Sequence, residues 1–119
     1  MRVLTQLLAN MASEHVQTKY MVSGTRDEYL VPSELLEDAY YAMRLVKENR
    51  PGTKTLTASA RASIMELAPL LEKAKNLRLV ETASPEQLIF HPAWMAIREQ
   101  AAKCLRELNF DREAWEAQQ

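Results

Sequence analysis

Glycine and aromatic residues are scarce in this chain, and their scarcity favours helices over strands. Two glycines occur among 119 residues, and aromatic residues make up 7%. Sheet-rich folds use glycine in tight turns and aromatic residues along their strands. Because hydrophobic residues still reach 47%, the chain has enough apolar material for a core. These proportions predict a mainly α domain.

Cysteine is also scarce, since Cys104 is the only one. A single thiol excludes an internal disulfide and a metal site built from several thiolates. We interpret Cys104 as a small apolar filler on the last long helix. No apolar run approaches the roughly 20 residues of a membrane span, and the opening residues have too short an apolar stretch for a signal peptide. We therefore expect a cytoplasmic protein without a membrane partner.

No set of residues points to catalysis. Two distant glycines cannot form a phosphate-binding loop, and no nucleophile has an evident base. His15 and His91 lack the Glu-x-x-His spacing of a helical metal site, and we interpret His91 as a capping or packing residue. The carboxylates within residues 34–38 suit the solvated first turn of a helix. We expect no enzyme activity and no cofactor.

The first half of the chain contains two helical patterns. Residues 3–11 carry a short apolar stripe, and Ser33 can cap a longer helix that ends before Arg50-Pro51-Gly52. Residues 16–31 fit either short strands or an irregular connector, and we favour the connector.

The middle of the chain predicts a long helix and an extended segment. Thr57 can cap a helix over residues 58–77, which Pro69 should kink or split near residues 66–68 by removing a backbone hydrogen bond. Two strand-like pieces follow within residues 78–90. The turn signal Ser84-Pro85 separates them, so they either pair as a small hairpin or run extended.

The last third begins with His91-Pro92, and proline suits the first turn of a helix. Apolar residues then recur at helical spacing up to Leu108. Asn109 can end this helix in the left-handed conformation, and Asp111 can cap another.

The expected fold is mainly α, with three to four helices and at most one small β-hairpin near residues 78–90. It forms one helical domain over residues 1–119, in which residues 1–31 supply an N-terminal helix and the connector.

Basic residues gather between positions 44 and 61, with Glu48 as the only acidic residue among them. Hydroxyl side chains alternate with them and can donate to phosphate. The order of helix, loop and helix start is like a helix–turn–helix, although this loop is longer than usual. One reading is a DNA-binding surface, and the other is a solvated connector that matches the helix dipole. The candidate DNA-binding residues are Arg44, Lys47, Arg50, Lys54 and Arg61.

Large apolar groups crowd the terminal helix. A chain of this size buries only about two-thirds of its unfolded surface by folding alone. We expect Ile97, Ala101 and Leu105 to face the chain's own core. The residues expected at or near a contact between subunits of a homo-oligomer are Trp94, Phe110 and Trp115.

Residues 33–115 resemble the small subunit of tailed-phage terminases, in the branch whose small subunit is helical. The features that match the family are, in chain order, a helix, a Leu-Thr helix start, a long helix, a His-Pro dipeptide, a terminal helix with Ile-Arg and two later leucines, and a break followed by arginine. In this chain the corresponding residues are Leu35–Lys47, Leu56-Thr57, 58–77, His91-Pro92, Ile97-Arg98, Leu105, Leu108, 109–111 and Arg112. Asn109 stands where the family has glycine in the break, and Ser59-Ala60-Arg61 replaces the aspartate usual in the middle helix.

The resemblance implies a non-enzymatic role in viral DNA packaging. Such subunits form oligomeric rings, bind duplex DNA at the packaging site, and recruit or regulate the large terminase subunit, an ATPase–nuclease. The alternative hypothesis is a small helical protein–protein interaction module, such as an adaptor or an inhibitor of a host enzyme. A chain with net charge −1 and no catalytic set suits both hypotheses.

Overall fold

A computed structural model describes residues 2–24 and 31–119. Within these ranges the chain is helical and contains no strand, so the predicted fold class is confirmed at that level. Among these residues, seven α-helices are five or more residues long, whereas the sequence predicted three to four helices. In chain order the elements are α1 (Arg2–Ala12), α2 (Glu14–Gln17), the π-helix η1 (Thr18–Val22), α3 (Pro32–Lys47), α4 (Ala58–Met65), α5 (Leu67–Asn76), α6 (Leu79–Thr82), α7 (Pro85–Ile89), α8 (Pro92–Glu107) and α9 (Arg112–Glu116).

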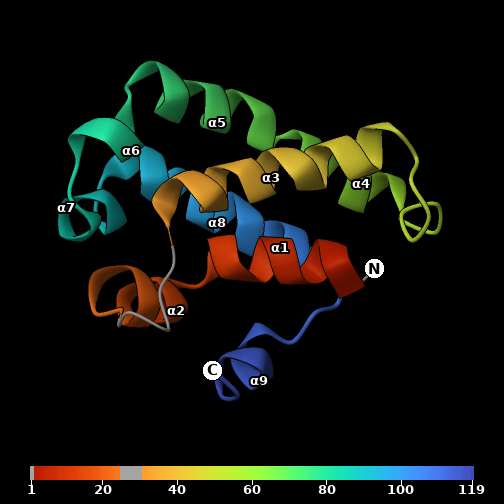
Figure 1. The fold of residues 1–119 in the computed structure, drawn as a ribbon. Coiled ribbons are helices and arrows are strands. Elements are labelled where there is room, and N and C mark those ends of the chain that lie inside the picture. Colours follow the sequence, from red (N-terminus) through yellow and green to blue (C-terminus); the bar gives the residue numbers. More distant parts are fainter. Residues whose placement is uncertain (1, 25–30) are drawn as a thin grey trace.

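Helix α8 is the central element of the bundle. It packs against α1, α4 and α5, and α1 packs in turn against α3. Figure 1 shows α8 behind α1 and α3, with α5 above them and α9 apart from the bundle below α1. The inward face of α8 carries Trp94, Ile97, Ala101 and Leu105, all at most 1% exposed. The predicted burial of Ile97, Ala101 and Leu105 is therefore confirmed, whereas the burial of Trp94 was not predicted.

The segment after α1 is helical, so the connector predicted from residue 16 is wrong over residues 16–22. Ser13 caps α2 by accepting a hydrogen bond from the Val16 amide. Gln17 then anchors the segment in the core, because its amide group donates to the Asn10 and Met11 carbonyls and accepts from the Trp94 indole at 3.0 Å. A buried polar group is tolerated when its hydrogen bonds are satisfied. The rest of the predicted connector includes residues 25–30, which lie outside the described ranges.

The N-cap of α3 lies two residues before the predicted cap. Val31 occupies the N-cap and Pro32 the first helical turn, so Ser33 lies inside the helix and does not cap it. Proline suits that turn because its missing N–H would have had no helical partner. The predicted caps Thr57 and Asp111 are confirmed, since their side chains accept from the Ala60 and Ala114 amides.

The long middle helix divides near residues 66–68, as predicted from the position of Pro69. α4 ends at Met65, Glu66 separates the two helices, and α5 starts at Leu67. Pro69 thereby falls in the first turn of α5, where the missing N–H has no partner to lose.

The extended segment predicted over residues 78–90 is instead two short helices, α6 and α7. Arg78 takes a left-handed conformation with φ 53° and separates α5 from α6. Ser84 and Gln87 then form a reciprocal capping box, which starts α7. Leu88 and Ile89 of α7 are buried, so their apolar character reflects the core and not a strand. Within the described residues, no helix is both long and apolar enough to cross a bilayer.

Candidate functional site

The basic segment lies at the end of α3 and along the loop to α4. α3 closes with a Schellman motif around Asn49, which has φ 51°. The Asn49 amide donates to the Val46 carbonyl at 3.2 Å, and the Arg50 amide donates to the Leu45 carbonyl at 3.0 Å. Both bonds satisfy carbonyls that a helix end leaves unpaired. The loop therefore leaves α3 in a defined direction.

The Arg61 side chain is hydrogen-bonded to the loop and to the end of α3. Its guanidinium donates to the Asn49 side-chain oxygen at 2.9 Å and to the backbone carbonyls of Val46 and Thr53. Thr53 is buried, and its hydroxyl donates to the Arg50 carbonyl at 2.7 Å. The structure thus places the guanidinium of Arg61 on protein acceptors. Three of its hydrogen bonds are thus directed into the loop, which sets Arg61 apart from the other candidate DNA-binding residues, and its contact with DNA stays a prediction.

The other four predicted cations lie on the surface. Arg44, Lys47 and Lys54 are exposed, and no carboxylate among the described residues forms an ion pair with them. The guanidinium of Arg44 stacks over the Tyr41 ring at 5.6 Å from its centroid. Arg50 lies 3.6 Å from the Glu48 carboxylate, an exposed pair of the kind that contributes about 0–1 kcal/mol. Arg44, Lys47 and Lys54 therefore have no ion-pair partner among the described residues, and Arg50 has only this exposed one.

Most of the neighbouring hydroxyls have structural partners. Thr57 caps α4, Thr53 is buried in the loop, and the Ser59 hydroxyl donates to the Glu107 carboxylate at 2.8 Å. Thr55 is exposed. The Thr53 and Ser59 hydroxyls therefore already donate to protein acceptors, whereas Thr57 only accepts, so Thr55 and Thr57 are the exposed hydroxyls still expected to donate to phosphate.

A hollow beside the cations was not predicted from the sequence. It has a volume of about 300 Å³ and lies between the start of α1, the outer side of α3 and the loop. Val3 and Tyr41 at this hollow are 60% and 41% exposed. Val3 belongs to the apolar stripe predicted over residues 3–11, and the packing of α1 on α3 leaves it exposed. The lining residues are Val3, Leu4, Tyr41, Leu45, Arg50, Pro51 and Thr53.

The three residues predicted at a subunit contact differ in exposure. Trp94 is wholly buried, and its indole donates to Gln17, so its side chain offers no surface to a second chain. Phe110 and Trp115 are partly buried against the edge of the core. Phe90, at the end of α7, is 67% exposed, and the strand interpretation of its segment concealed this exposure. Phe110 and Trp115 remain the candidates for a contact between copies of this chain.

The side chains that could take part in catalysis or bind a metal are buried, cap a helix or lie beside other carboxylates. Burial raises the pKa of the Cys104 thiol to about 12, so the thiol is protonated at neutral pH and is a poor nucleophile. His91 caps α8, because its Nδ1 accepts from the Ala93 amide at 3.1 Å. The pKa of Asp38 is raised by burial and then by the nearby carboxylates of Glu34 and Glu37. In the described part of the chain, no three metal-ligating side chains lie together.

Comparison of the chain with protein-family models, with curated proteins and with solved structures gives no match in any of the three. The resemblance to terminase small subunits therefore rests on the residues quoted from the sequence.

Proposed function

We propose that this protein is a non-enzymatic DNA-packaging subunit that binds the phosphates of duplex DNA through the end of α3 and the α3–α4 loop. The observation that carries the proposal is the group of four exposed cations in this connection, Arg44, Lys47, Arg50 and Lys54, with Glu48 as the one acidic residue between positions 44 and 61. Phosphate contacts of this kind supply affinity without reading the base sequence.

The rigidity of the loop supports the proposal. Arg61 and the Schellman motif at Asn49 fix the backbone that carries Arg50 and Lys54. A surface that is already ordered loses less conformational entropy when it binds. Arg61 thus contributes to DNA binding by positioning the loop, while the other cations make the contacts.

The test is a titration of duplex DNA over a range of salt concentrations with the triple variant Arg44→Gln, Lys47→Gln, Lys54→Gln. Each phosphate contact contributes about 0.9 to the slope of log K against log salt, so losing three contacts should lower the slope by about 2.7. Affinity at low salt should fall with it.

A matched control is Lys73→Gln, Lys75→Gln, Arg106→Gln. These three cations are also exposed, lie near the ends of α5 and α8, and give the same change in net charge. The control should keep the slope of the parent. If both triple variants bind DNA equally well, the assigned surface is wrong.

The packaging role itself rests on the resemblance. It would require a homo-oligomer in the host cytoplasm and a complex with the large ATPase–nuclease subunit. Co-purification of the chain with such a subunit, encoded next to it, would support this part of the proposal. DNA binding without any such partner would leave a DNA-binding module and remove the packaging role.

The second candidate function is a helical protein–protein interaction module, and the hollow beside the loop favours it. Exposed apolar side chains at a concave site are typical of protein docking surfaces. The double variant Val3→Ser, Tyr41→Ser should then release a captured protein partner that the triple glutamine variant still binds. A partner that both variants retain equally would contradict docking at this hollow.

A further inference from the structure

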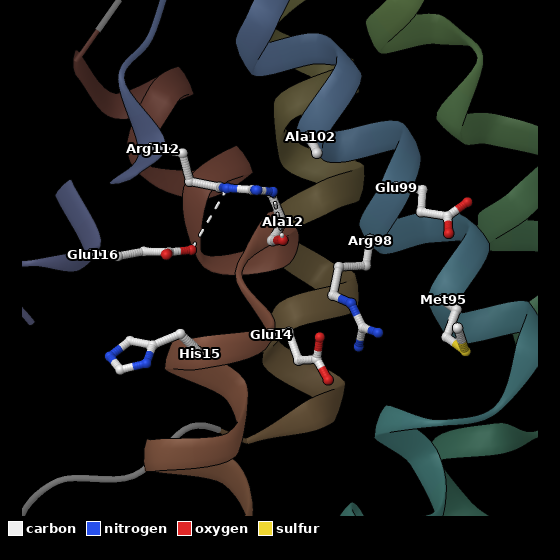
Figure 2. A pocket seen from close by; sticks show the side chains of 9 residues that line it. All are labelled: Ala12, Glu14, His15, Met95, Arg98, Glu99, Ala102, Arg112 and Glu116. Atoms are coloured by element: carbon white, nitrogen blue, oxygen red, sulfur yellow. Dashed lines mark hydrogen bonds and ion pairs between the residues drawn. The ribbon is translucent and has the colours of Figure 1, made fainter. Parts of the chain in front are cut away.

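A second hollow, of about 450 Å³, lies between α2, α8 and α9, and shares no residue with the proposed DNA surface. Figure 2 shows the side chains that line it, which come from these three helices and from Ala12 at the end of α1. None of the residues of α9, which forms one wall, is buried. This wall is attached to the rest of the chain by the hydrogen bonds from the Ser13 hydroxyl to Glu116 and from Arg112 to the Ala12 carbonyl.

Arg98 is the unusual residue of this hollow. It is 8% exposed, and its Nη1 donates to the Ile89 carbonyl at the end of α7 at 2.9 Å. No carboxylate among the described residues forms an ion pair with it. A buried charge without a counter-charge is costly. The Ile89 carbonyl satisfies one donor, and in the described part of the chain no carboxylate balances the positive charge.

Glu14 is the complementary charge across the hollow. It is exposed, and no described cation forms an ion pair with it. Figure 2 shows the Glu14 carboxylate extending toward Arg98, whereas the Glu99 carboxylate turns to the other side. Arg112 is already paired with Glu116 at 3.6 Å, and Glu116 also accepts from the Ser13 hydroxyl. Of the charged lining residues, Arg98, Glu14 and Glu99 thus form no ion pair among the described residues, and of the two carboxylates only that of Glu14 extends toward Arg98.

We propose that this hollow binds a neutral aliphatic α-amino acid. Its carboxylate would accept from the Arg98 guanidinium, which can donate two parallel hydrogen bonds to a carboxylate. Its ammonium group would lie against Glu14. Met95, Ala12 and Ala102 line the remaining wall and suit an uncharged side chain. A simple anion fits less well, because the Glu14 carboxylate would repel it. This ligand site goes beyond the proposed DNA-binding function.

The test is an NMR titration of the ¹⁵N-labelled full chain with L-leucine, compared with N-acetyl-L-leucine and L-leucinamide. The two derivatives each retain one of the two charges. L-leucine should give saturable shifts in the amides of α2, α8 and α9, with the derivatives at least about tenfold weaker, which corresponds to about 1.4 kcal/mol. N-acetyl-L-leucine binding as tightly as L-leucine would overturn the proposal. So would the absence of saturable shifts up to about 50 mM, well above a millimolar dissociation constant.

Two variants separate the ligand site from the structural role of Arg98. Glu14→Gln changes an exposed residue and should weaken L-leucine binding severalfold while circular dichroism stays unchanged. Glu99→Gln is the matched control, because its carboxylate turns away from Arg98, and it should bind as the parent does. Equal affinity of the parent and both variants would overturn the assigned orientation. Since Arg98 also holds α7, no conclusion depends on replacing it.

Discussion

At the residue scale, the side chain of Arg61 joins the two sides of the α3–α4 connection. Its acceptors are the Asn49 side chain and the Val46 carbonyl at the end of α3, and the Thr53 carbonyl in the loop. A backbone carbonyl that loses such a donor while it is shielded from water costs about 1–3 kcal/mol. The free energy of unfolding should therefore depend on Arg61 more than on any exposed cation of the same segment.

We predict that Arg61→Met lowers the free energy of unfolding by about 1–3 kcal/mol, because the loop carbonyls lose their donor. For a chain of this length, this change corresponds to a melting temperature lower by roughly 4–12 °C. Thermal unfolding followed by circular dichroism measures it.

Lys54→Met is the control for Arg61→Met, since it removes one positive charge from the same loop at an exposed position without a hydrogen-bond partner of this kind. Its melting temperature should stay close to that of the parent. Equal melting temperatures for the two variants would show that the hydrogen bonds of Arg61 do not support the loop.

At the element scale, the helix ends that the sequence predicted well depend on local chemistry. Asn109 takes the left-handed conformation with φ 57°, and the Phe110 amide closes the Schellman motif on the Leu105 carbonyl at 3.0 Å. Asp111 caps α9, and Pro69 marks the start of α5. Each of these signals acts within a few residues of its own position, so no knowledge of the rest of the fold was needed.

The short helices could not be assigned from periodicity in the same way. Leu88 and Ile89 form an apolar pair that fits a strand or a buried helical turn equally well. The Ser84–Gln87 capping box was the available signal for α7. The helical segment of residues 14–22 depends on Gln17, whose partner Trp94 is 77 positions away in the chain. Such a contact exists only in the folded molecule.

In the candidate sites, too, some features are visible in the sequence and others depend on the fold. The cluster of basic residues is visible in the composition of residues 44–61, but the sequence does not say which cation is already bound to the protein. Arg61 and Arg98 look like ordinary surface cations in the sequence. The fold directs one into a loop and buries the other beside a hollow.

At the scale of the whole molecule, we expect a second copy of this chain to contact the partly buried aromatic residues Phe110 and Trp115. Trp115 donates from its indole to the Gln6 side chain at 3.3 Å, and its ring packs at the edge of the core with Phe110. Trp94 fills the core and takes no part in such a contact.

We predict that light scattering gives a mass several times 13.6 kDa for the parent chain. Trp115→Ala should lower this mass without unfolding the protein, because the core is formed by α8 and its neighbours and no residue of α9 is buried. Trp115→Phe keeps an aromatic ring and should retain more of the assembly. A parent chain that stays monomeric at tens of micromolar would contradict both the contact and the ring that the resemblance implies.

The buried thiol described above makes the molecule easy to label at a chosen position. Cys104 is inaccessible, and its pKa of about 12 keeps it protonated at neutral pH, so thiol-directed reagents should leave the native chain unmodified. Because it is the only cysteine, Ala117→Cys would place a single reactive thiol at an exposed position next to α9. A fluorophore or spin label attached there would report on the separation of α9 from the bundle in the otherwise natural sequence.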